Sequence, residues 1–375
     1  MKFKVSSKEF YNAASAVCKV INTKNALMIL DNFLITLDGN MLTITGSDVE
    51  NALTARLEVA DGKGNGSVCL GARRLVDLLK ELPDQGVEVS VNEDTLEVQL
   101  SYPSGHYSYV GITPEQYPVF KNDDQENPLS FSLATSQLIE GLENTMFACS
   151  VDEYRQIMQG VLLDINPESV TYVATDTRKL VKYVDRRTAP GVTCRCVLPP
   201  KPSNIIKNVF AKEESLTLTI NSRSAIFESE HYTFQCTLLN GVYPEYNRVL
   251  PKNNTNILTV ERVAFLNAVR RVGLFVEGGA SLEKFRMTPE KILLKSNDPS
   301  LCTSAREQIP CNYSGNELTI GFNASCLAEI LGTLKGNEII VNLGDASRPG
   351  IFRPSEEPDN TELLMLLAPI TVSEF

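Results

Sequence analysis

The chain has 375 residues, of which 43% are hydrophobic and 22% are charged, and its formal net charge is -11 at pH 7. This length predicts two or three domains, and the composition is typical of globular rather than disordered or fibrous proteins. No apolar run is long enough to span a membrane and residues 1–6 lack an apolar signal core, so we expect a cytoplasmic protein. The acidic total counts against nucleic-acid binding by the outer surface.

An alternating strand, a polar turn and an amphipathic helix occur three times, beginning at Phe3, Phe131 and Leu258. These starts lie 128 and 127 residues apart, which indicates an internal repeat. Polar segments at Lys121–Pro128 and Pro251–Asn256 are typical of linkers. The repeat therefore predicts three domains, over residues 1–125, 126–253 and 254–375.

A second strand and helix follow in each repeat, beginning at Val68, Cys196 and Ile320, and paired strands come after them. Each domain is therefore predicted to be α+β, with two βαβββ halves. Because each helix must cover its apolar face with a sheet, six such halves in a row suggest an arc or ring. In that arrangement the antiparallel sheets lie outside and the helices inside.

An aspartate ends one strand of every repeat, at Asp48, Asp176 and Asp298. Together with Glu50, these carboxylates could hold a metal or act in acid–base catalysis. A catalytic group is normally needed at one site, whereas an aspartate repeated at equivalent positions favours a turn that bonds the nearby backbone.

Metal and cofactor sites are not predicted. The chain has two histidines and nine cysteines, without the paired spacing of a zinc site or a disulfide framework. We expect the cysteines to be reduced and mostly in the core. The sequence also lacks a glycine-rich phosphate loop and a nucleophile elbow.

Basic residues are placed by the predicted pattern on the second helix of each domain. They are Arg73, Arg74, Lys80, Lys201, Lys207 and Lys335, and Lys24, Arg270 and Arg271 lie near first helices. If the helices line a pore, these cations converge on its axis while most acidic residues remain outside. A negative total charge is then compatible with DNA in the pore.

The whole chain resembles the bacterial beta sliding clamps, the beta subunits of DNA polymerase III. The most specific stretches are residues 27–34, 45–50, 173–180, 241–252 and 320–325. The resemblance implies the DNA clamp fold and a head-to-tail homodimeric ring around B-form duplex DNA, bound without regard to sequence. It also implies a clamp loader that opens the ring with ATP, and no cofactor in the clamp itself.

Partner proteins are implied to insert a short peptide between the second and third domains. These partners are the replicative polymerase catalytic subunit, translesion polymerases, mismatch-repair proteins and ligase. The matching pocket positions are Met158, Thr175, Thr177, Arg178, Lys179, Leu180, Pro244, Arg248, Val249, Leu366, Leu367, Ala368, Pro369 and Ile370.

The resemblance also implies DNA contacts and a ring interface. Lys24, Arg73 and Lys201 match DNA contacts, and the interface joins Tyr107 and Tyr109 to Leu274 and Phe275 of the partner.

Three departures from the family pattern alter the expected sites. Thr177-Arg178-Lys179 replaces a common Gly-His-Arg, and Gln156-Ile157 replaces an aromatic pair near the pore. Residues 368–372 replace a Met-Pro-Met-Arg-Leu-like tail and are followed by three additional residues.

Two other functions remain open at this point. One is a monomeric peptide-binding scaffold that does not encircle DNA. The other is an enzyme with an acidic site that acts on nucleic acid or phosphate.

Overall fold

The structure is a computed structural model that describes residues 1–118, 128–276, 281–300, 302–372 and 375. Residues 121–127 of the predicted linker lie outside the described residues, as do Ser373 and Glu374 of the tail. The chain forms two compact units, one of residues 1–139 and 201–238, the other of residues 140–200 and 239–375. No described helix combines the length and the apolar character that a membrane crossing requires.

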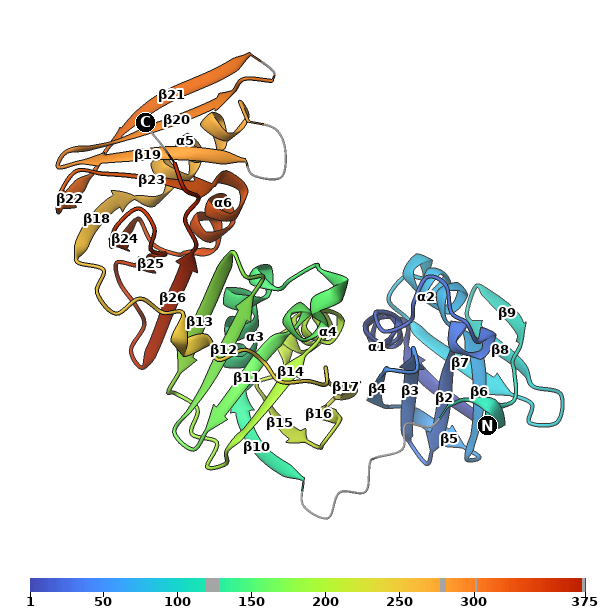
Figure 1. Cartoon of the computed structure of the whole chain (residues 1–375). Helices are drawn as coiled ribbons and strands as arrows, with labels where there is room; N and C mark the ends of the chain where they lie inside the picture. Colours follow the sequence, from blue (N-terminus) through green and yellow to red (C-terminus); the bar gives the residue numbers. More distant parts are fainter. Residues whose placement is uncertain (119–127, 277–280, 301, 373–374) are drawn as a thin grey trace. The chain divides into compact units, whose positions relative to one another are not determined.

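Two βαβββ halves occur in each repeat, which confirms the predicted pattern (Figure 1). The first repeat contains β1 (Lys2–Ser6), α1 (Ser7–Cys18), β2 (Asn32–Asp38), β3 (Met41–Ser47), β4 (Asn51–Glu58), β5 (Ala60–Lys63), β6 (Gly66–Gly71), α2 (Ala72–Glu81), β7 (Gly86–Val91), β8 (Glu97–Tyr102) and β9 (Gly105–Val110). The second contains β10 (Leu129–Ala134), α3 (Thr135–Thr145), β11 (Val161–Asn166), β12 (Ser169–Thr175), β13 (Lys179–Asp185), β14 (Cys194–Leu198), α4 (Pro200–Val209), β15 (Ser215–Ile220), β16 (Ser224–Glu228) and β17 (Tyr232–Thr237).

The third repeat adds one short strand, β22, to the same pattern. It contains β18 (Asn256–Glu261), α5 (Arg262–Gly273), β19 (Leu282–Thr288), β20 (Lys291–Asp298), β21 (Thr303–Pro310), β22 (Asn312–Ser314), β23 (Leu318–Asn323), α6 (Ala324–Thr333), β24 (Glu338–Leu343), β25 (Gly350–Pro354) and β26 (Thr361–Leu367). Short 3-10 helices are η1 (Met28–Asp31), η2 (Pro114–Gln116), η3 (Met146–Ala148), η4 (Glu153–Gln159), η5 (Phe210–Lys212) and η6 (Tyr246–Arg248).

Polar residues between strand and helix cap the helices. The side chains of Ser6, Glu261 and Asn323 accept hydrogen bonds from backbone N–H groups in the first turns of α1, α5 and α6. Such bonds satisfy donors that have no partner within the helix. The polar turns of the sequence pattern therefore fix where these helices begin.

Each half contributes its first strand to the sheet of the other half. In the first repeat β1 pairs with β7, and β6 pairs with β2. The same exchange joins β10 to β15 and β14 to β11, and then β18 to β24 and β23 to β19. The two halves of the first and third repeats are therefore held together by backbone hydrogen bonds, as well as by packing of α1 on α2 and of α5 on α6.

The last strands of the halves join consecutive repeats. Strand β4 pairs antiparallel with β17 in an eight-stranded sheet, and β13 pairs antiparallel with β26 in a nine-stranded sheet. Strands β9 and β21 occupy the equivalent positions in the five-stranded and four-stranded sheets, and each lies at an edge of its sheet. An edge strand presents backbone donors and acceptors that another chain can pair with.

Candidate binding sites

The repeated aspartates bond the backbone of their own turns, as predicted. Oδ1 of Asp48 accepts from the N–H groups two and three residues farther on, at 3.1 and 2.7 Å. Asp176 repeats both bonds at 2.9 and 2.8 Å, and Asp298 makes the first of them at 2.9 Å. The structural explanation of these residues is therefore confirmed.

The three predicted DNA contacts lie around one segment that follows α1. Arg73 donates to the backbone oxygen of Asn22 over 3.3 Å, and Nζ of Lys201 donates to Oδ1 of the same residue over 2.7 Å. Lys24 is exposed two residues later. Lys201 also forms an ion pair with Asp48, so its ammonium already has acidic and amide partners.

The other predicted cations have different surroundings. Arg74 and Lys80 are exposed on α2, while Lys207 is partly buried on α4. The placement of Lys335 on a helix is wrong, because α6 ends at Thr333.

The predicted peptide site begins at the turn between β12 and β13. Thr177 has a φ of 79°, in the left-handed region, and its side chain accepts from Arg155 at 2.9 Å. Oγ1 of Thr175 donates to the carbonyl oxygen of Lys179 over 2.7 Å. The carbonyl oxygen of Arg178 accepts from Ala368 N over 2.8 Å, which ties the turn to the C-terminal segment.

An apolar cluster underlies this turn. Leu180 and Leu366 are opposite each other in the pairing of β13 with β26, and both belong to a buried cluster with Tyr243 and Tyr246. Of the remaining predicted positions, Leu367 is buried; Met158, Ala368, Pro369 and Ile370 are half-buried; and Pro244, Arg248 and Val249 are exposed. Half-buried and exposed side chains thus border a buried apolar base.

Lys179 is a predicted site residue that the structure buries. Its Nζ lies 3.1 Å from Asp176 Oδ2 and 2.6 Å from Glu329 Oε2 on α6. Burial tends to lower the pKa of Lys179, but its carboxylate partners Glu329 and Asp176 raise it above the ordinary value. The ammonium is therefore charged and faces the protein interior.

A polar network around the buried carboxylate of Asp164, which the sequence did not reveal, holds the loop of the site. The Tyr246 hydroxyl donates to Oδ2 of Asp164 over 2.9 Å, and Arg195 approaches the same oxygen at 2.9 Å. Arg195 also reaches Glu245 at 3.3 Å. Burial, and then the bond to Asp164, raise the pKa of Tyr246 to about 12, so this tyrosine remains a donor.

Replacing Tyr246 by phenylalanine should lower the free energy of unfolding by about 1–3 kcal/mol, because a buried carboxylate loses a donor. Urea denaturation measures this loss. Tyr154→Phe is the matched control, since Tyr154 is almost fully exposed. Equal stability of the two variants would contradict the anchoring role of Tyr246.

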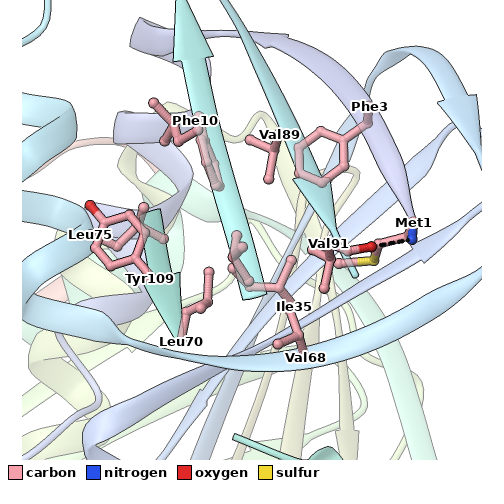
Figure 2. Close-up of a pocket in the computed structure, with 12 residues that line it drawn as sticks. Met1, Phe3, Phe10, Ile35, Val68, Leu70, Leu75, Val89, Val91 and Tyr109 are labelled. Atoms are coloured by element: carbon pink, nitrogen blue, oxygen red, sulfur yellow. Dashed lines mark hydrogen bonds between the residues drawn. The ribbon is translucent and has the colours of Figure 1, made fainter. Parts of the chain in front are cut away.

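The predicted interface residues divide into outward and inward side chains. Leu274 is 80% exposed and Phe275 is also exposed, immediately after α5. Tyr107 is exposed on edge strand β9, whereas Tyr109 points inward with Leu75 to line a small apolar cavity (Figure 2). Tyr109 can therefore serve an interface mainly through its backbone.

A larger hollow of about 470 Å³ lies beside β9 at the start of α2. Val110, Ile112, Tyr109 and Arg74 are among the residues that line it. Burial raises the pKa of Tyr109, and nearby Arg74 opposes that shift. This hollow thus combines exposed apolar groups with the charged side chains of Asp31, Arg73 and Arg74 at a sheet edge.

Comparison with known proteins identifies one family along the chain. Models of the N-terminal, central and C-terminal domains of the DNA polymerase III beta subunit match residues 1–121, 132–245 and 247–368. The Beta sliding clamp of Staphylococcus epidermidis is 26% identical, over 97% of this chain and 98% of that protein. The Beta sliding clamp of Pseudomonas aeruginosa is 24% identical, over 97% of this chain and 99% of that protein.

Solved structures of similar proteins have the same fold. A sliding clamp from Bartonella birtlesii bound to griselimycin is 25% identical, covers 99% of this chain and 100% of its own, and has a TM-score of 0.91. The DNA polymerase beta subunit of Streptococcus pyogenes is 25% identical over the same shares, with a TM-score of 0.92.

Proposed function

The chain belongs to the DNA polymerase III beta subunit family and is a DNA sliding clamp, and we propose that it works as a head-to-tail homodimeric ring. The ring would encircle duplex DNA, with helices inside and sheets outside, and tether polymerases and repair proteins. We assign its three domains to residues 1–125, 126–253 and 254–375.

The pairing of last strands carries this proposal. Strand β4 ends the first half of the first repeat, and it pairs with β17, which ends the second half of the second repeat. In the same way β13 ends the first half of the second repeat, and it pairs with β26, which ends the second half of the third repeat. Applied once more, the rule pairs β21 with β9 of a second copy. Two copies joined in this way have β9 and β21 of each copy paired, which favours a closed ring over a scaffold monomer.

Exposed side chains support the same contact. Leu274 and Phe275 are exposed next to β21, where the carbonyl oxygen of Phe275 accepts from the Thr303 hydroxyl, and the hollow at β9 offers Val110 and Ile112. Burying such apolar groups stabilises an association.

Sedimentation of the unsubstituted protein should give a mass near twice 41.4 kDa, and a monomer at micromolar concentration would contradict the ring.

DNA would be held by encirclement and weak, sequence-independent phosphate contacts. We propose Lys24, Arg73, Arg74, Lys80, Lys201 and Lys207 as those contacts. Because the net charge is -11, the protein depends on local positive charge within the ring rather than on its overall potential.

Partner peptides would bind over the cluster of Leu180 and Leu366. The exposed and half-buried residues around that apolar base fit a short extended segment with hydrophobic anchors. We propose the clamp loader, the replicative and translesion polymerases, mismatch-repair proteins and ligase as partners, in the cytoplasm. The clamp itself would catalyse no reaction, since its repeated aspartates are engaged in turns.

We propose that griselimycin, to which the Bartonella birtlesii clamp is bound, occupies this site. Replacing Val249 by serine should then weaken griselimycin binding about tenfold, because one apolar anchor contact is lost. Isothermal titration calorimetry measures the affinity. Val263→Ser is the matched control, since Val249 is 53% exposed and Val263, on α5, is 45% exposed. Equal affinities for the two variants would remove Val249 from the site.

A further inference from the structure

Lys179 is a charged residue with little access to solvent. Its side chain is only 7% exposed, and its Nζ lies between Asp176, Glu329 and the ring of Phe147, whose centroid is 6.0 Å away. A buried ammonium is costly unless carboxylates pair with it. The two ion pairs therefore hold Lys179 in one place.

Its chain neighbours belong to the peptide site. Arg178 is exposed and its carbonyl oxygen accepts from Ala368, while Leu180 enters the apolar cluster. Asp176 uses Oδ1 for the backbone of the turn and Oδ2 for the Lys179 ammonium. A shift of Lys179 would therefore move the turn, the C-terminal segment and the apolar base together.

The first repeat makes an equivalent connection, in which the helix supplies the cation and the turn supplies the carboxylate. Asn51 occupies the position of Lys179, and its Nδ2 donates to both oxygens of Asp48, at 3.1 and 3.0 Å. The cation there is Lys201 of α4, which pairs with Asp48. In the second repeat the turn supplies the cation and α6 supplies the carboxylate, Glu329. At both junctions an ion pair fixes the aspartate turn to the second helix of the following repeat.

We propose that Lys179 is a positioning residue of the peptide site, which ties the turn over residues 176–179 to helix α6 through Glu329. It does not contact the bound peptide. The role rests on the proposed peptide-binding function and assigns a part in it to Glu329, on a helix whose residues lie outside the predicted site.

The test uses griselimycin as the probe, with calorimetry on the full-length protein. Lys179→Met and Glu329→Gln should each raise the Kd of griselimycin about tenfold. The Kd of the double variant should not exceed that of the weaker-binding single variant, because both substitutions remove the same ion pair. Lys179→Arg should restore most of the affinity. Lys335→Met, at an exposed lysine beyond α6, is the control and should leave Kd unchanged.

Hydrogen exchange adds a local measurement. In Glu329→Gln the amides of Arg178 and Lys179, which bond Asp176, should exchange faster while the urea midpoint stays close to that of the unsubstituted protein. Glu329 is half-exposed, so this variant is expected to fold even if Lys179→Met does not.

Two results separate the possible failures. If Glu329→Gln leaves both Kd and exchange unchanged while Lys179→Met weakens binding, Lys179 contacts the ligand directly and the positioning role is overturned. If the unsubstituted protein does not bind griselimycin, the peptide site is contradicted as well, and the positioning role is lost with it.

Discussion

Leu274→Asp is expected to convert the dimer into a monomer of 41.4 kDa. Leu274 is 80% exposed in the isolated chain, so a carboxylate there remains in water and folding is unaffected. In the proposed ring the same carboxylate would leave water for the hollow beside β9, where Val110 and Ile112 are apolar and Arg73 and Arg74 supply cations. Desolvation of a charge without a fitted hydrogen-bonding partner costs several kcal/mol, which weakens association by several orders of magnitude.

Sedimentation velocity at micromolar concentration measures this change. Val151→Asp provides the control, because Val151 is 95% exposed and precedes η4, which is not part of the proposed interface. The control should remain dimeric. A dimer in both variants would show that the contact lies elsewhere, and a monomer in both would show that any added charge opposes association.

Glu283→Gln is expected to stabilise the protein at alkaline pH by an amount on the order of 5 kcal/mol. Glu283 is fully buried on β19, and neither carboxylate oxygen has a hydrogen-bond partner among the described residues. Burial, and then the negative charge of Glu307, raise the pKa of Glu283 from 4.5 to about 8. Glutamine has nearly the same shape and carries no charge.

The sign of the effect follows from the raised pKa. Below about pH 4.5 the Glu283 carboxyl is protonated in both the folded and the unfolded chain, so it does not change the free energy of unfolding with pH. Between about 4.5 and about 8 the unfolded chain ionises while the folded chain stays neutral, so stability falls as the pH rises. Above about 8 the loss is complete.

Urea denaturation of the unsubstituted protein and of Glu283→Gln from pH 4.5 to pH 9 measures the difference between their free energies of unfolding. The titration of other groups contributes equally to both proteins and therefore cancels in this difference. The advantage of Glu283→Gln should grow through this window and then level off. Glu290→Gln, at an exposed glutamate of the same repeat, should show a nearly constant difference. A constant difference for Glu283→Gln as well would mean that the buried carboxyl has an ordinary pKa.

Local patterns in the sequence predicted the elements of the fold. Period-two strands, helical spacing and the repeated turn aspartates are features of neighbouring residues, and the structure confirms the βαβββ halves and the role of Asp48 and Asp176. Strand exchange between halves could not be predicted this way. An alternating strand such as β1 shows which of its faces is buried but not which strand it pairs with.

The sites were predicted less completely, because their contacts join distant parts of the chain. A lysine is ordinarily exposed, so the burial of Lys179 depends on Glu329, 150 residues away. Tyr246 and Asp164 are 82 residues apart. Tyr109 was placed correctly on an edge strand, but only the structure shows that its side chain turns toward the core.

Retention on DNA tests the central claim of encirclement most directly. The protein is loaded by its clamp loader onto nicked circular DNA, and gel filtration in high salt is run before and after the DNA is cut once. A closed ring should stay with the circle, because topology does not depend on phosphate contacts, and should leave the linear DNA through its free ends. Retention on linear DNA, or loss from the circle at the same salt concentration, would contradict encirclement.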